Sequence, residues 1–317
     1  MKRRPITPED RREWANVLHL LVLNGLVQDS AFKNKSLAFH GGTSLHLSWH
    51  SPRFSEDLDF LVSRELASKL DKVITRAARR IQEGLVVIDP GFQLEINRRR
   101  GSREKLNHYA FKVSKPNIIG KVMVKLEMWK VESDYVERYE TNFRTPLVKN
   151  DLIAHIRPEP LPAATLISAF CDKMVAFATR PHLKWRDIFD VWWLTTNAQT
   201  DIPPMPDIAR RFIQHLSEYR TYEDLPPSSA LDRFVAVLEQ SHGPEQDRDL
   251  KNWLPQDLWD RLYPEQITAM TTAATSFATH LAAAVRDQGL DAHYHPDSPV
   301  ATQQAIQEAF DGKSPGY

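Results

Sequence analysis

Apolar residues follow a helical period at the start of the chain and then form a short strand that ends on two glycines. The segment Thr7–Asp10 combines a capping residue, a proline and an acidic first turn, and the apolar residues after it recur at helical spacing. The run 36–40 is short and apolar and ends on Gly41 and Gly42. This order predicts a strand, a tight turn and a second helix capped by Thr43.

The period of the apolar pattern changes twice in the rest of the chain. Residues 58–62 alternate as in a strand, and a helical pattern follows at 65–81. Between about residues 85 and 132 the period changes to two in the runs 92–96, 109–113 and 122–128, which predicts strands of one sheet. From about residue 162 the pattern is helical, in the segments 163–179, 184–195, 206–219, 229–240, 265–287 and 302–310.

These patterns predict an α+β protein with two domains. Residues 1–150 are expected to form a mixed β-sheet flanked by helices, and residues 151–317 a mostly α-helical part. The formal net charge is zero, but residues 1–150 carry 27 Lys and Arg against 18 Asp and Glu, whereas residues 151–317 carry 14 against 23. The first half is therefore expected to face an anion, with mutual attraction of the two halves as the alternative interpretation.

The sequence gives no sign of a disulfide, a signal peptide or a membrane span. Cys171 is the only cysteine, which excludes an intramolecular disulfide and a cysteine zinc site and favours a reducing compartment. The basic N-terminus runs into acidic residues rather than an apolar core, and the stretch Ile267–Val285 is interrupted by threonines and a histidine. We therefore expect a cytoplasmic protein.

The segment with the clearest chemistry joins the glycine turn to a pair of aspartates. Backbone N–H groups at Gly41 and Gly42 can approach an anion closely, and the helix that follows adds a partial positive charge. Asp57 and Asp59 are two residues apart at the start of a strand, so both side chains point to one side. Two carboxylates there can hold Mg²⁺, which in turn binds phosphate oxygens.

At this point the sequence resembles the AbiEii-type toxins of the nucleotidyltransferase superfamily, which include the MenT toxins of mycobacteria. The resemblance rests on four blocks in the family's order, and nothing beyond about residue 200 contributes to it. The blocks are Gly41–Leu45, Arg53–Phe60, Val124–Glu127, and Asp172-Lys173 through Arg180 to Arg186–Asp190.

The resemblance implies a mixed, twisted sheet flanked by helices and a nucleotidyltransferase activity. In such toxins a nucleotide is transferred from a nucleoside triphosphate, often to the 3′ acceptor end of tRNA, which blocks translation. A cognate antitoxin partner and a role in phage defence are further expectations. The expected cofactor is Mg²⁺, as two ions, with Mn²⁺ as the alternative, and no membrane is involved.

The resemblance and the chemistry of the residues agree on the metal ligands. Asp57 and Asp59 would hold the two ions that orient the α-phosphate and activate the attacking hydroxyl. Glu127, on the strand at 122–128, is the candidate third carboxylate. Its alternative interpretation is a strand carboxylate paired with Lys125 or an arginine.

Residues around the glycine turn are expected to contact the phosphates. Gly41, Gly42 and Thr43 would form the cradle, with Ser55 beside it; in the resembling toxins a serine here can be phosphorylated, which silences the site. Arg53 is a candidate phosphate or sheet-edge contact, and the alternative is a surface arginine paired with Glu56.

Two residues of the helical part complete the expected catalytic set. In the family a lysine at the position of Lys173 contacts the triphosphate, and an aspartate best matched by Asp187 is needed for activity. A lysine supplies a compact charge, and an aspartate beside it can hold it in place. Asp190 is the rival of Asp187, three residues further along the same helix face, and a solvated helix lysine is the alternative for Lys173.

Other acceptors and other classes of protein stay open. The basic run Arg98–Lys105 could follow an RNA backbone or be a solvated turn. The alternatives to a tRNA acceptor are nucleotidyl transfer to a protein or small molecule, and a non-catalytic nucleotide-binding module. A kinase is the least favoured class, because the chain lacks a lysine-bearing glycine loop.

Overall fold

The computed structural model describes most of the chain as two compact units, residues 1–165 and residues 166–317. The chain returns to the sheet after residue 150, so the first unit extends to Thr165. The described residues are 3–32, 35–100, 105–147, 152, 156–197, 199–241, 249–295, 302 and 306.

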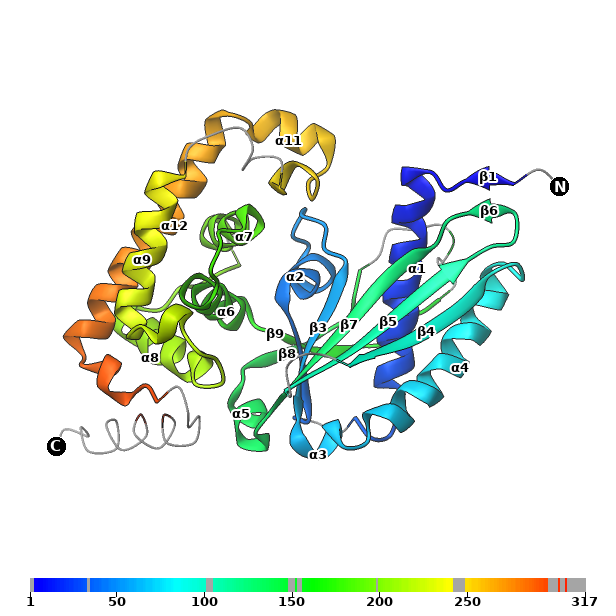
Figure 1. Cartoon of the computed structure of the whole chain (residues 1–317), viewed down its shortest axis with the longest axis horizontal. Helices are drawn as coiled ribbons and strands as arrows, with labels where there is room; N and C mark the ends of the chain where they lie inside the picture. The colour runs from blue at the N-terminus through cyan, green and yellow to red at the C-terminus, as the bar shows by residue number, and fades with distance from the viewer. Residues whose placement is uncertain are drawn as a thin grey trace. The chain divides into compact units, whose positions relative to one another are not determined.

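The first unit is built around a mixed β-sheet (Figure 1). Its elements are β1 (Arg4–Pro5), α1 (Pro8–Val27), β2 (Leu37–His40), α2 (Gly41–Trp49), β3 (Asp57–Ser63), α3 (Arg64–Ala67), α4 (Leu70–Ile88), β4 (Gln93–Arg100), β5 (Leu106–Ser114), β6 (Ile118–Ile119), β7 (Val122–Val131), α5 (Ser133–Arg138), β8 (Thr141–Arg144) and β9 (Leu161–Ala164). Among the described residues, seven strands pair in the order β4-β5-β7-β3-β2-β9-β8, and β1 and β6 pair separately. β3 runs parallel to β7 and β2 parallel to β9, whereas the other ladders of the seven-stranded sheet are antiparallel.

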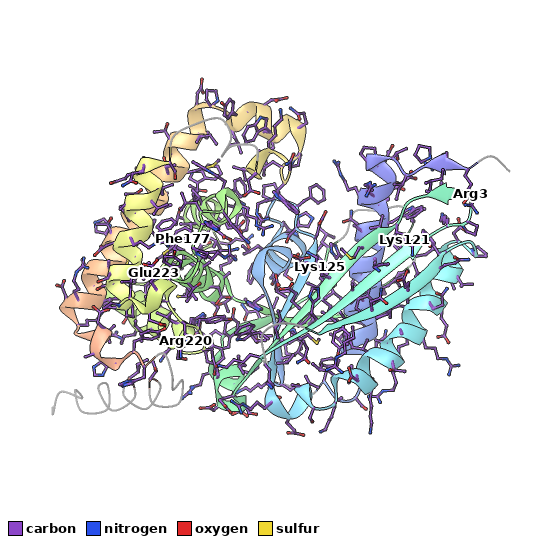
Figure 2. The ribbon with its side chains drawn as sticks, viewed as in Figure 1. Arg3, Lys121, Lys125, Phe177, Arg220 and Glu223 are labelled. Atoms are coloured by element: carbon purple, nitrogen blue, oxygen red, sulfur yellow. The ribbon has the colours of Figure 1, made fainter. Side chains whose placement is uncertain are left out.

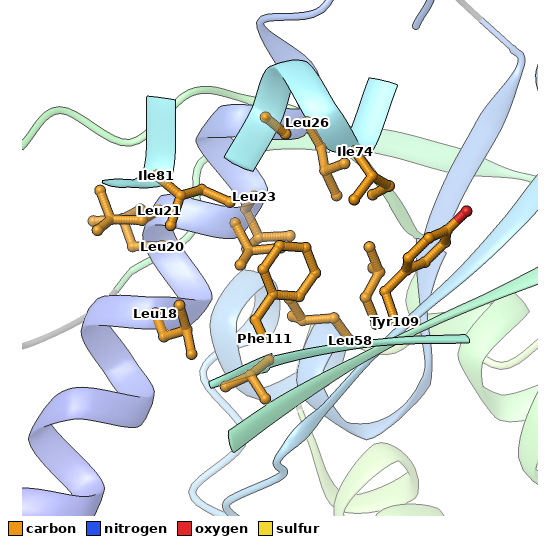
Figure 3. Close-up of a cluster of buried hydrophobic side chains, with 14 of the residues drawn as sticks. Leu18, Leu20, Leu21, Leu23, Leu26, Leu58, Ile74, Ile81, Tyr109 and Phe111 are labelled. Atoms are coloured by element: carbon orange, nitrogen blue, oxygen red, sulfur yellow. The ribbon is translucent and has the colours of Figure 1, made fainter. Parts of the chain in front are cut away.

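Helices α1 and α4 cover one face of this sheet and form its main core. Thr7 and Asp10 make a reciprocal capping box that starts α1, as the sequence predicts. Leucines of α1 pack with Ile74 and Ile81 of α4, and with Leu58 and Phe111 of the sheet (Figure 3). Because side chains alternate along a strand, the neighbours of Leu58 at Asp57 and Asp59 point to the opposite face.

All the regular secondary structure in the described residues of the second unit is helical. Its elements are α6 (Leu166–Thr179), α7 (Trp185–Thr196), α8 (Met205–Leu216), η2 (Tyr222–Asp224), α9 (Pro227–Gln240), α11 (Gln256–Leu262), α12 (Glu265–Asp287) and η3 (Leu290–His293). Helix α6 packs against α7, α8 and α9, and α12 packs along the same three helices. Phe170 of α6 meets Phe277 of α12 edge to face, with ring centroids 5.3 Å apart.

The α+β prediction is confirmed, and three local predictions need correction. Thr43 does not cap α2, because the helix begins at Gly41 with His40 as its N-cap residue. The pattern at 65–81 covers two helices, since a turn at Lys69, whose N–H donates to the Leu66 carbonyl oxygen at 2.9 Å, separates α3 from α4.

The last correction concerns the residues before α6, which form a strand and not the first helical turn. Ala163 and Ala164 belong to β9, where small apolar residues fit between β2 and β8. The helix predicted at 302–310 lies almost wholly outside the described residues. No helix in the described part of the chain is long and apolar enough to cross a membrane.

Candidate active site

The glycine turn places the backbone directly against a carboxylate and a guanidinium. Gly41 has φ +76°, in the left-handed region that favours glycine. A Cβ at Gly41 would lie 2.5 Å from Oδ2 of Asp59, and a Cβ at Gly42 would lie 2.2 Å from Nη2 of Arg53. Neither position has room for a side chain. Glycine is therefore needed at both positions for the turn to contact these two charged groups.

Arg53 is a buried support of this turn, with only 2% of its surface exposed. Its Nη1 donates to the Phe54 carbonyl oxygen at 2.8 Å. Ser55 lies beside the same glycine, with Oγ 3.2 Å from the place that a Cβ on Gly42 would take. The alternative of a surface arginine is therefore wrong, and Ser55 lies beside the turn as the resemblance implies.

Two side chains from different helices hold the backbone that leads into β3. The Thr43 hydroxyl, which is fully buried, donates to the carbonyl oxygen of Asp57. Nε2 of His19 in α1 lies 2.9 Å from the Glu56 carbonyl oxygen, which can only accept, so Nε2 carries the proton. Burial lowers the pKa of His19 to about 4, which keeps the ring neutral near pH 7.

The two aspartates have different neighbours on β7. Asp57 is in register with Lys125, whose Nζ lies 3.2 Å from Oδ1 of Asp57 (Figure 2 labels Lys125). This Oδ1 atom is buried and has no hydrogen-bond partner among the described residues, because the contact with Lys125 is an ion pair without hydrogen-bond geometry. Asp59 is in register with Glu127, so these two carboxylates share one face of the sheet.

The oxygen donors of this face suit a hard divalent cation such as Mg²⁺. The buried Oδ1 of Asp57, which accepts no hydrogen bond within the described residues, fits a role as a ligand. Within the described part of the chain, no three His, Cys, Asp or Glu side chains are arranged to hold one ion. Ligation of a metal ion by Asp57, Asp59 and Glu127 therefore stays a prediction.

The second unit contains its own buried charged cluster. Nζ of Lys173 in α6 lies 2.9 Å from Oδ1 of Asp187 and 2.8 Å from Oδ2 of Asp190, both in α7. Lys173 is 7% exposed, so it is not a solvated helix lysine. Arg180 also pairs with Asp187. Both aspartates pair with Lys173, so the choice between Asp187 and Asp190 as the residue needed for activity stays a prediction.

The basic run lies partly outside the described residues. Arg98 extends from β4 and pairs with Asp71 of α4, on the side of the sheet that α1 and α4 cover. Residues 101–104 are not among the described residues. Contact of this run with RNA stays a prediction.

Comparison with known proteins identifies the family of the chain. The family model for the nucleotidyl transferase AbiEii toxin of type IV toxin–antitoxin systems matches residues 25–289, most of the sequence. The chain belongs to the AbiEii toxin family. It is therefore a nucleotidyltransferase, as its sequence motifs predict.

Solved structures confirm the fold that this AbiEii-family chain adopts. MenT4, a nucleotidyltransferase toxin from Mycobacterium tuberculosis H37Rv, is 18% identical, with a TM-score of 0.56 over 93% of this chain and 92% of that chain. A Helicobacter pylori protein assigned to the nucleotidyltransferases is 16% identical, with a TM-score of 0.50 over 89% of this chain and 98% of that chain. No curated protein sequence gives a match. At these identities the similarity shows a shared fold.

Sequence reasoning missed several residues that support these clusters. His19 carries no local signal, because it is one polar residue within an apolar helix and its partner is 37 positions away. Lys125 could be found only as a neighbour of Glu127, yet in the structure it contacts Asp57. Arg180 lies within the fourth block, but its pairing with Asp187 requires the turn between α6 and α7.

Proposed function

We propose that this nucleotidyltransferase toxin transfers a nucleotide to the 3′ acceptor end of tRNA and thereby blocks translation. The observation that carries the proposal is the contact of the glycine turn with Asp59. A glycine turn that leads into a helix N-terminus, where a phosphate can bind, adjoins a carboxylate that can hold a cation, and nucleotidyl transfer from a triphosphate requires both.

In the proposed reaction the first unit binds and orients the reacting phosphates. The backbone at Gly41 and Gly42 approaches the triphosphate, since no Cβ shields it. Arg53, which lies against Gly42, fixes the shape of the turn. Asp57 and Asp59 hold Mg²⁺, as two ions or with Mn²⁺ in its place. The bound metal would neutralise phosphate charge and activate the attacking hydroxyl, which forms a bond to the α-phosphorus while the α–β phosphoanhydride bond breaks and pyrophosphate leaves.

Lys173 and Asp187 are the proposed contribution of the second unit. The two carboxylates at less than 3 Å restrict the rotamers of Lys173, which prepares it to bind a phosphate. We assign Lys173 to the triphosphate, and Asp187 to holding Lys173. This part of the proposal rests on the family and on the burial of the cluster.

The same site suggests how the toxin is restrained. Ser55 lies against Gly42, so a phosphoryl group on its hydroxyl would add negative charge where the triphosphate is proposed to bind. Type IV toxins have an antitoxin partner, and phosphorylation of Ser55 is one route to inhibition. A role in phage defence is part of the same proposal.

The proposal is tested by incubating the purified chain with total tRNA, Mg²⁺ and each α-labelled nucleoside triphosphate in turn. The Asp59→Ala variant is the inactive control, and Glu95→Gln, from the edge strand β4, is the matched control. Label on tRNA with the wild type and Glu95→Gln, but not with Asp59→Ala, supports the proposal. Label on protein or on a small molecule instead would assign another acceptor, and no label with any nucleotide would contradict nucleotidyl transfer to tRNA.

A further inference from the structure

A cationic pocket in the second unit lies beside the Lys173 cluster. It is formed by the end of α6, the turn that follows, the first turn of α7, and α9. Its lining residues are Ala176, Phe177, Arg180, His182, Leu183, Lys184, Asp187, Arg233, Phe234 and Val237. Asp187 is the only carboxylate among these residues, against two arginines and a lysine.

The apolar side of the pocket is rigid. Phe177 of α6 and Phe234 of α9 stack with ring centroids 3.7 Å apart and an interplanar angle of 9° (Figure 2 labels Phe177). A stacked aromatic pair leaves little room for water, so charges beside it interact more strongly than they would in bulk solvent.

The turn that carries the cations is fixed by Arg233. Its Nη1 donates to the Arg180 carbonyl oxygen at 2.8 Å and its Nη2 to the Pro181 carbonyl oxygen at 2.7 Å. Arg233 therefore positions the turn without any carboxylate partner among the described residues.

The two carboxylates of the cluster form ion pairs with other cations, and neither of them pairs with Lys184. Asp187 and Asp190 neutralise Lys173 and Arg180 through the ion pairs described above. The side-chain ammonium group of Lys184 makes no hydrogen bond or ion pair with any described residue, and Asp249 is the one carboxylate that acts on its charge at longer range. A half-buried cation without a partner in a rigid pocket is a strong candidate for binding an external anion.

We infer that this pocket binds a phosphate group, with Lys184 and Arg180 as its cationic ligands and Arg233 holding the turn that presents them. The inference adds a phosphate site to the proposed function and does not depend on transfer activity. The phosphate could belong to the nucleoside triphosphate or to the backbone of the acceptor RNA. Both present the same oxygen anion to Lys184.

The titration of Lys184 is consistent with this assignment. Burial, followed by the positive charges of Arg180, Arg186 and Lys173, lowers the pKa of Lys184 to about 8, and Asp249 acts in the opposite direction. A bound anion would raise the pKa again. Binding of sulfate, which does not itself titrate near pH 8, should therefore take up protons at that pH in the wild type.

The test is calorimetric titration of the full chain with inorganic phosphate and with tripolyphosphate at low ionic strength. The variant is Lys184→Met, which leaves intact the bonds from the Asp187 and Ile188 N–H groups to the Lys184 carbonyl oxygen. The control is Lys251→Met, an exposed lysine of the same unit. Loss of one charge-assisted hydrogen bond should weaken binding at least about tenfold in Lys184→Met and leave it unchanged in the control.

Two further titrations distinguish the sources of the phosphate. A weaker affinity of Lys184→Met for the nucleoside triphosphate alone assigns the pocket to the triphosphate, and a weaker affinity for an acceptor-stem RNA alone assigns it to RNA. Equal binding of inorganic phosphate by the wild type and Lys184→Met would overturn the inference. Melting temperatures of all variants confirm that each is folded.

Discussion

Asp59 and Glu127 lie directly opposite each other on the parallel strands β3 and β7, on the face of the sheet away from α1 and α4. Side chains at opposed positions of a sheet are neighbours, and two like charges there repel each other. A cation bound between them would remove that repulsion. The pairing therefore links the strand register to the proposed chemistry, because a shift by one residue would move Glu127 to the core face.

We expect Glu127→Gln to raise the Mg²⁺ concentration needed for half-maximal transfer. The amide keeps the shape of the side chain but is a weaker ligand for a hard cation than a carboxylate. The measurement is transfer rate against Mg²⁺ concentration. Glu95→Gln is the control, because Glu95 lies on the same face of the sheet but on the edge strand β4. An unchanged Mg²⁺ dependence in Glu127→Gln would remove Glu127 from the set of ligands.

Gly41→Ala should abolish transfer, whereas Gly289→Ala should not. Both glycines have positive φ, +76° and +67°, so the backbone conformation alone should cost each alanine about 1–2 kcal/mol of stability. Only the alanine at 41 would meet a carboxylate, since a Cβ there lies 2.5 Å from Oδ2 of Asp59, whereas Gly289 has nothing within 4 Å.

Denaturant unfolding and transfer assays on both glycine variants separate these effects. Similar losses of stability with activity lost only in Gly41→Ala would show that the close approach to Asp59 matters. Activity retained in Gly41→Ala would argue against a phosphate cradle at this turn.

The first half of the fold could be read from the sequence because its signals are local. The capping box at Thr7 and Asp10, the strand before Gly41 and the alternating strands from 92 to 128 each depend on neighbouring residues. The short strands β8 and β9 were missed, because their residues have no distinct period and are fixed by pairing with each other and with β2.

Residues of the site that belong to a sequence motif could be predicted. Residues that are placed by a partner distant in the sequence could not. Asp57 and Asp59 are two residues apart, so their common side follows from the strand alone. The hydrogen bond of His19 to the Glu56 carbonyl oxygen joins residues far apart in sequence, and only the packing of α1 on the sheet brings them together. The same holds for Lys184, whose neighbours come from three helices.

Lys173→Met should destabilise the protein strongly, in addition to any loss of activity. Asp187 and Asp190 are 3% and 0% exposed, and both would lose their lysine partner. Removing one partner of a buried ion pair typically costs about 3–5 kcal/mol. Urea unfolding measures this loss, and the exposed Lys251→Met is the control that should change by less than about 0.5 kcal/mol. Comparable stability in the two variants would mean that the buried carboxylates have sufficient other partners.

Burial of His19 should make the protein less stable as the pH falls below neutrality. The pKa of His19 is lowered from 6.5 to about 4 in the folded state. Between these values the unfolded chain binds more protons, so the free energy of unfolding rises with pH through this window and is lost on acidification. From about pH 7.5 to about pH 5 the expected loss from His19 is about 2 kcal/mol. Burial also lowers the pKa of His46, which adds to the same slope.

Urea unfolding of His19→Gln at the same pH values isolates the contribution of His19. Glutamine can still donate to the Glu56 carbonyl oxygen but does not titrate, so the variant should lose less stability on acidification than the wild type. His280→Gln is the matched control, because His280 is exposed on α12 and should leave the wild-type slope unchanged. Carboxylates with lowered pKa, such as Asp29 and Asp89, change the free energy of unfolding mainly below about pH 4. They therefore contribute little to the slope in the window of His19. Equal slopes in His19→Gln and the wild type would show that His19 is not held neutral in the folded protein.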